Sequence, residues 1–149
     1  MKNLLKRISL AMTALPMFLA GGARADDPVY TREPLDQIKS SVQDKKAVLV
    51  DVRERKEWDR GHIDGAVLIP LSKLAKWEES GISEAEKKEL SKTLPRGSVV
   101  YCHCAFGGRA LTGAGVLHNL GYDARPLKQG YSSLIGAGFP KAQESTPGS

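Results

Sequence analysis

The sequence predicts one α/β domain in which a mainly parallel sheet is flanked by helices. Short apolar runs rich in β-branched residues alternate with helix-like stretches along most of the chain, which is the pattern of parallel sheets. The chain has 149 residues, of which 41% are hydrophobic and 26% charged, as expected for one globular domain. No internal repeat or linker indicates a second domain.

The first expected elements are a helix and a buried strand. Thr31 is expected to cap a helix that has Pro34 in its first turn and an apolar stripe from Leu35 to Val42. Residues 47–52 are rich in β-branched valine and almost continuously apolar, which predicts a strand covered on both faces.

A second strand and a second helix follow. The apolar run at residues 66–69 is expected to form a short strand that ends at Pro70. Ser83 and Glu86 have the spacing of a capping box, which predicts a helix that runs to about Leu94.

The remaining elements lie on both sides of a glycine-rich turn. Residues 98–102 are expected to form a strand, and residues 109–120 a helix that Gly121 can end at its C′ position. Residues 124–127 are expected to form a last short strand, and residues 131–137 a last helix.

The first 25 residues are predicted to be a signal peptide. A positively charged start precedes an uncharged run of about 13 residues at positions 8–20, and Ala23-Arg24-Ala25 supplies a small-x-small cleavage pattern. This run is shorter than the roughly 20 residues that a spanning helix needs, so no stable membrane anchor is expected. We expect export to the periplasm after cleavage near Ala25, a domain over residues 26–140 and a disordered tail over residues 141–149.

The net charge does not indicate a nucleic-acid partner. The formal charge is +5, but four basic residues and no acidic ones lie in the predicted signal peptide. The mature domain is therefore nearly neutral, and it lacks the strongly basic balance typical of nucleic-acid binding.

The two cysteines are candidates for chemistry rather than for a structural crosslink. Exported proteins usually use cysteines as disulfide staples, yet Cys102 and Cys104 are only two residues apart and cannot staple a fold. Cys104 lies between the end of a predicted strand and the start of a predicted helix, where unpaired N–H groups favour a thiolate. A buried structural cysteine beside a tight turn is the alternative interpretation.

The residues after Cys104 are typical of an anion-binding loop. Gly107 and Gly108 allow the backbone to curl so that its amides can converge on the sulfur or on a bound anion. Arg109 adds a fixed positive charge with a fork geometry that fits sulfur or phosphorus oxyanions.

Two ordered motifs over residues 30–140 identify the chain as similar to single-domain rhodaneses, a family of sulfurtransferases. The matching stretches are Leu49-Val50-Asp51-Val52-Arg53-Glu54, Glu57-Trp58, Gly61-His62-Ile63-Asp64-Gly65-Ala66, Val99-Val100-Tyr101 and Cys104-Ala105-Phe106-Gly107-Gly108-Arg109-Ala110-Leu111. In the last family motif a Gly-Gly pair and a tryptophan are commoner than the Gln129-Gly130 and Leu134 found here.

The resemblance implies a three-layer fold with a mainly parallel sheet of about five strands. It also implies a nucleophilic Cys104 and a substrate-binding loop made of Ala105, Phe106, Gly107, Gly108 and Arg109. The thiolate would take sulfur from a small donor such as thiosulfate, and a thiol or cyanide acceptor would remove it. The family resemblance implies no metal or organic cofactor.

Asp51, Arg53 and Cys102 are supporting candidates. Asp51 and Arg53 follow a predicted buried strand, where they could hydrogen-bond the active-site loop or form a purely structural ion pair. Cys102 is expected to be a small buried residue or, alternatively, a resolving thiol that attacks a persulfidated Cys104.

Two further functions compete with the sulfurtransferase interpretation. A persulfide carrier or thiol redox protein would use both Cys102 and Cys104. A cysteine phosphatase or arsenate reductase is less favoured, because the phosphatase signature has five residues between cysteine and arginine, whereas four separate Cys104 from Arg109.

Overall fold

The computed structural model describes residues 28–143 and contains a four-stranded parallel sheet. The strand order is β2-β1-β3-β4, with β1 at Ala47–Asp51, β2 at Val67–Leu68, β3 at Val99–His103 and β4 at Asp123–Pro126. The two central strands, β1 and β3, pair over five residues from Ala47↔Val99 to Asp51↔His103. Their carboxyl ends therefore lie next to each other at one edge of the sheet.

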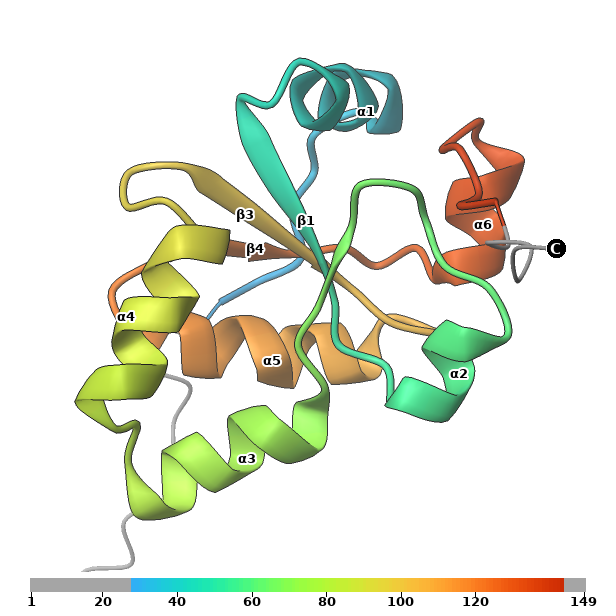
Figure 1. Cartoon of the computed structure of the whole chain (residues 1–149). Helices are drawn as coiled ribbons and strands as arrows, with labels where there is room; N and C mark the ends of the chain where they lie inside the picture. Colours follow the sequence, from blue (N-terminus) through green and yellow to red (C-terminus); the bar gives the residue numbers. More distant parts are fainter. Residues whose placement is uncertain (1–27, 144–149) are drawn as a thin grey trace, which may run out of the picture.

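Helices cover both faces of this sheet and give the three layers that were predicted (Figure 1). Below the sheet in Figure 1 lie α3 at Leu71–Ser80, α4 at Glu84–Thr93 and α5 at Gly108–Asn119. The opposite face carries α1 at Leu35–Gln43 and α6 at Tyr131–Gly136. The short helix α2 at Arg55–Asp59 follows β1.

Each face has its own apolar core. Val50, Val100 and Cys102 point toward α3, α4 and α5, where they pack with Leu74 and Leu117. On the other face, the alternating residues Leu49 and Tyr101 pack with Ile38, Leu127 and Leu134 of α1, the segment after β4 and α6. This alternation along β1 and β3 is what a parallel strand buried on both faces requires.

The expectation of about five strands is corrected to four. The extended segment 28–33 approaches β4, but the one backbone hydrogen bond between them runs from the Thr31 N–H to the Pro126 carbonyl at 3.0 Å. A single backbone hydrogen bond does not make a ladder, so the segment 28–33 does not form a fifth strand.

Two details of the helices differ from the sequence analysis. Thr31 does not cap α1, because its hydroxyl accepts from the Glu33 N–H and Pro34 occupies the N-cap position. Helices α2 and α3 were not predicted. The predicted capping box of α4 is confirmed: the Ser83 hydroxyl accepts from the Glu86 N–H at 3.3 Å, and the Glu86 carboxylate accepts from the Ser83 N–H at 3.1 Å.

The described chain continues slightly past residue 140. Lys141 forms an antiparallel bridge with Ile63, and the Ala142 N–H donates to the His62 carbonyl at 2.9 Å. The predicted signal peptide and the rest of the predicted tail lie outside the described residues.

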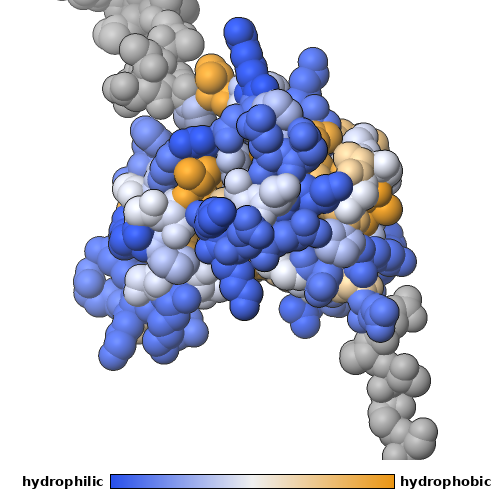
Figure 2. Space-filling view, turned by 90° about the horizontal axis from the view of Figure 1, so that it is seen from above, coloured by the Kyte–Doolittle hydropathy of each residue, from blue (hydrophilic) through white to orange (hydrophobic). Residues whose placement is uncertain are grey.

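The face seen in Figure 2, which looks onto the molecule from the α1 and α6 side, is mostly hydrophilic, with apolar residues in small patches. Between residues 28 and 143, no helix is long and apolar enough to cross a bilayer. The largest exposed apolar side chain in that range is Phe106, which is 94% exposed.

Candidate active site

The candidate site lies beyond the carboxyl ends of β1 and β3, the usual place for a site in an open parallel sheet. Cys104 is the first residue after β3, and α5 begins four residues later at Gly108. The strand, the loop and the helix therefore place the thiol in front of the positive end of a helix of 12 residues.

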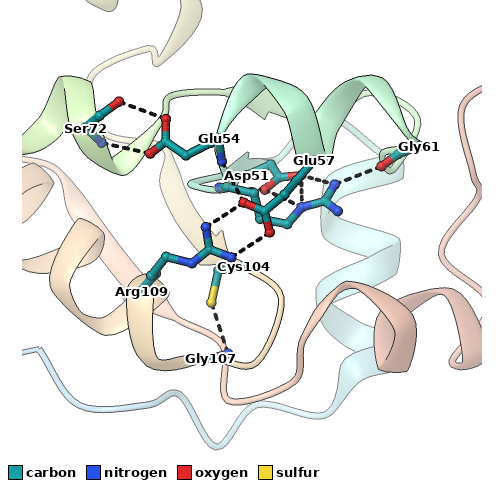
Figure 3. Close-up of polar contacts among 9 residues, drawn as sticks. Asp51, Glu54, Glu57, Gly61, Ser72, Cys104, Gly107 and Arg109 are labelled. Atoms are coloured by element: carbon teal, nitrogen blue, oxygen red, sulfur yellow. Dashed lines mark hydrogen bonds and ion pairs between the residues drawn. The ribbon is translucent and has the colours of Figure 1, made fainter.

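The loop wraps closely around the sulfur. Cys104 Sγ accepts a hydrogen bond from the Gly107 N–H at 3.0 Å, and its side chain is 1% exposed (Figure 3). Gly107 has φ +93°, and a Cβ there would lie 2.5 Å from the Lys128 carbonyl oxygen, so glycine is required. Of the loop amides that were predicted to converge on the sulfur or on a bound anion, the Gly107 N–H donates to the sulfur.

The segment after β4 holds the loop from the other side. The Tyr131 N–H donates to the Cys104 carbonyl at 2.8 Å. At Gly130 a Cβ would collide with the Ala105 carbonyl, so the first turn of α6 packs directly against the loop backbone. Gly130, the second residue of the Gln129-Gly130 pair, is therefore a glycine at the position where the backbone before α6 contacts the backbone of the Cys104 loop.

Arg109 does not stand free above the thiol, because Glu57 of α2 binds it through both carboxylate oxygens (Figure 3). The two N–O distances are 2.6 and 2.7 Å. Hydrogen bonding to Arg109 lowers the pKa of Glu57 to about 2, and the same contact raises the pKa of Arg109, so both groups are charged at neutral pH. Arg109 belongs to the first turn of α5, which begins at the end of the Cys104 loop, so the ion pair and the thiol are parts of one site.

Sequence reasoning missed the role of Glu57. The residue belongs to one of the matching motifs, but it lies 52 positions before Arg109, and no local pattern joins them. The only available signal was an acidic residue in a family motif with no assigned partner.

Asp51 and Arg53 form a buried ion pair rather than hydrogen bonds to the loop. Arg53 Nη2 donates to Asp51 at 2.7 Å and to the Gly61 carbonyl at 2.9 Å, and both side chains are almost fully buried. The Arg53 guanidinium carbon lies 4.2 Å from the centre of the Tyr131 ring. Support for the loop is therefore indirect, because Tyr131 also binds the Cys104 carbonyl through its N–H.

Cys102 lies in the apolar core between the sheet and α5, and it is fully buried. Burial raises the pKa of its thiol to about 12, so the thiolate is scarce at neutral pH. The structure therefore gives Cys102 the surroundings of a core residue.

His103 is also fully buried, with its Nε2 3.6 Å from Asp51. Burial lowers its pKa, which keeps the ring neutral at pH 7. Within residues 28–143, no group of three or more His, Cys, Asp or Glu side chains could hold a metal ion.

A shallow open depression adjoins the loop. Six residues line it: Ala105, Phe106, Lys128, Gln129, Gly130 and Ser133. Ala105 and Phe106 come from the loop itself, while Lys128 adds a positive charge at the rim.

The family model for the rhodanese-like domain matches residues 34–137 of this chain. Among solved structures, the chain is similar to a rhodanese-related protein from Thermoplasma volcanium, with 25% identity, a TM-score of 0.57, and coverage of 77% of this chain and 100% of that chain. It is also similar to a human single-domain sulfurtransferase, with 26% identity, a TM-score of 0.57, and coverage of 74% and 96%. A comparison with curated proteins found no significant match.

A single-domain sulfurtransferase from Saccharomyces cerevisiae shares the fold, with 24% identity, a TM-score of 0.57, and coverage of 73% of this chain and 95% of that chain. The match to the family model extends from the last residue before α1 to the end of α6. It therefore includes every helix and strand of the described structure.

Proposed function

This chain belongs to the rhodanese-like domain family, and from that premise we propose that it is a sulfurtransferase that carries sulfane sulfur as a persulfide on Cys104. The observation that carries the proposal is the hydrogen bond from the Gly107 N–H to Cys104 Sγ, at the start of α5. This arrangement stabilises the negative charge of the Cys104 thiolate, which is the form that attacks the donor and the form that leaves when the acceptor takes the sulfur. The name of the similar human protein, a single-domain sulfurtransferase, supports the same activity.

The proposed donor is thiosulfate. The Cys104 thiolate attacks the outer sulfur, the S–S bond of thiosulfate breaks, and sulfite leaves with the electron pair. A thiolate acceptor then attacks the terminal sulfur of the persulfide and restores the Cys104 thiolate, while the acceptor becomes a persulfide. Cyanide accepts the sulfur in the same way and becomes thiocyanate.

The size of the loop favours sulfur transfer over phosphoryl transfer. Four residues separate Cys104 from Arg109, so the loop is one residue shorter than the phosphatase signature. A shorter loop makes a smaller cradle, which suits the outer sulfur of the donor better than a phosphate group.

The persulfide-carrier or thiol redox alternative needs a second reactive cysteine. Cys102 is buried in the core and has a pKa of about 12, which disfavours a nucleophilic role at neutral pH. These surroundings support a reaction that uses Cys104 alone.

Three proteins test the proposal: wild type, Cys104→Ser, and Cys102→Ala as the matched control. After incubation with thiosulfate, intact mass spectrometry should show one added sulfur atom on wild type and Cys102→Ala, with an equivalent amount of sulfite released. Cys104→Ser should show neither. A sulfur adduct on Cys104→Ser, or release of phosphate from a phosphate ester without any sulfur adduct, would contradict the proposed function.

Export belongs to the same proposal, since the predicted signal peptide lies outside the described residues. Expression of the full chain in a bacterial host, followed by cell fractionation and N-terminal sequencing, should find a periplasmic protein that begins near Asp26. A cytoplasmic protein with an intact Met1 end would contradict it.

A further inference from the structure

We propose that Glu57 sets the charge preference of the donor site by neutralising the charge of Arg109. With Glu57 present, the site favours a dianionic donor over a monoanionic donor less strongly than it would with an unpaired Arg109. This inference rests on the proposed sulfurtransferase function. Glu57 acts through Arg109 and not on the reacting atoms, so it is a positioning and specificity-determining residue.

The geometry of Glu57 is fixed from both sides. Its two carboxylate oxygens each accept from one terminal nitrogen of Arg109, at 2.6 and 2.7 Å. One of these oxygens also accepts from the Glu54 N–H at 3.1 Å, at the start of α2. Glu54 in turn accepts from the Ser72 N–H and hydroxyl at the start of α3. The carboxylate is therefore oriented toward the guanidinium by a backbone N–H at the start of α2.

Only part of the guanidinium is occupied by this contact. Arginine has five N–H donors, and Glu57 takes two of them. The remaining donors can still bind an oxyanion, so Glu57 leaves the hydrogen-bonding capacity of Arg109 partly free while it cancels the charge. The side chains of Arg109 and Glu57 are 34% and 30% exposed, so an anion in solution can approach the pair.

The expected effect depends on the charge of the donor. In a water-like medium, a carboxylate about 8 Å from a bound anion disfavours a dianion about sixfold and a monoanion about two- to threefold. Loss of the Glu57 charge should therefore favour a dianionic donor over a monoanionic one by a further factor of about two to three.

Thiosulfate and methanethiosulfonate form a matched pair of donors. Both are attacked at a terminal sulfur; one releases sulfite and the other releases methanesulfinate. Thiosulfate carries two negative charges, whereas methanethiosulfonate carries one. The measured quantity is the ratio of kcat/KM for thiosulfate to kcat/KM for methanethiosulfonate, in wild type and in Glu57→Gln.

We expect this ratio to rise about two- to threefold in Glu57→Gln at low ionic strength and to return toward the wild-type ratio in 0.5 M salt, where charges are screened within a few ångströms. Glu57→Met removes the same charge without introducing an amide donor, and it should give the same change. Glu89→Gln is the matched control, because Glu89 is an exposed carboxylate of α4 that pairs with Lys92. Its ratio should equal that of wild type.

A purely structural role for Glu57 would lower kcat/KM for both donors by one common factor and leave the ratio unchanged. An unchanged or lower ratio in both Glu57 variants would therefore overturn this inference while the proposed function stands. Failure of wild type to form a persulfide with either donor would overturn the proposed function, and this inference with it.

Discussion

Replacing Gly130 with alanine should separate α6 from the active-site loop. Gly130 has φ −85°, so alanine meets no backbone strain there. The obstacle is steric: the new methyl group would lie against the Ala105 carbonyl and 3.0 Å from the Phe106 nitrogen. Because these are backbone atoms, relief requires movement of the loop or of the helix. Overpacking of this kind costs about 1–3 kcal/mol, and weakening the adjacent hydrogen bond from Tyr131 to Cys104 adds about 1 kcal/mol.

We therefore expect Gly130→Ala to lose about 3 kcal/mol of unfolding free energy, which for a domain of this size lowers Tm by roughly 10 °C. Displacement of the loop by about 1 Å should also lower the rate of sulfite release about 100-fold. Urea unfolding and a sulfite-release assay, both at 20 °C, measure the two effects separately.

Gly136→Ala is the matched control, because a Cβ at Gly136 in the same helix meets nothing within 4 Å. It should leave activity unchanged and alter stability by no more than about 1 kcal/mol, in the stabilising direction. The steric argument fails if Gly130→Ala unfolds within about 0.5 kcal/mol of wild type and still releases sulfite at the wild-type rate.

Three further outcomes are expected. Asp51→Ala should lower the unfolding free energy by about 3–5 kcal/mol in urea titrations, because Arg53 keeps a buried charge without its partner; a loss below about 1 kcal/mol would refute this. The pKa of Glu57 is lowered to about 2 in the folded protein, so its contribution to stability is present above pH 4.5 and is lost as the pH falls toward 2. The difference in unfolding free energy between wild type and Glu57→Gln, measured by urea unfolding, should therefore be constant from pH 7 to pH 5 and shrink below pH 5. A difference that grows on acidification would contradict this prediction. Because the Cys102 pKa is about 12, wild type persulfidated on Cys104 should form no internal disulfide within an hour at pH 7, as judged by non-reducing peptide mapping; a Cys102–Cys104 disulfide would restore the resolving-thiol role.

The sequence was sufficient to locate the strand, loop and helix that hold Cys104. The apolar run that became β3 and the glycines after Cys104 are local signals, and each acts within a few residues. The capping box at Ser83 is a signal of the same kind, and the structure confirms the helix that it predicted.

Contacts between distant segments could not be predicted in this way. Glu57 meets Arg109 only after β1 and β3 have paired, and the close approach of Gly130 to Ala105 likewise depends on where α6 docks. Helix α2 buries no residue and has no apolar stripe. Helix α3 has buried Leu74 and Trp77 three positions apart, a periodicity that could have predicted it, although no side chain caps its start.

The pairing of β1 with β3 also has a consequence for how the protein folds. The paired residues lie roughly fifty positions apart in the sequence, so this contact requires closure of a long loop and forms more slowly than a helix does. Cys104 is the residue directly after β3, and its carbonyl accepts a hydrogen bond from the Tyr131 N–H of α6, toward the C-terminal end of the domain. The reactive geometry therefore does not exist in a partly folded chain, and recovery of activity after dilution from denaturant should follow the slow, global folding phase rather than the formation of helices.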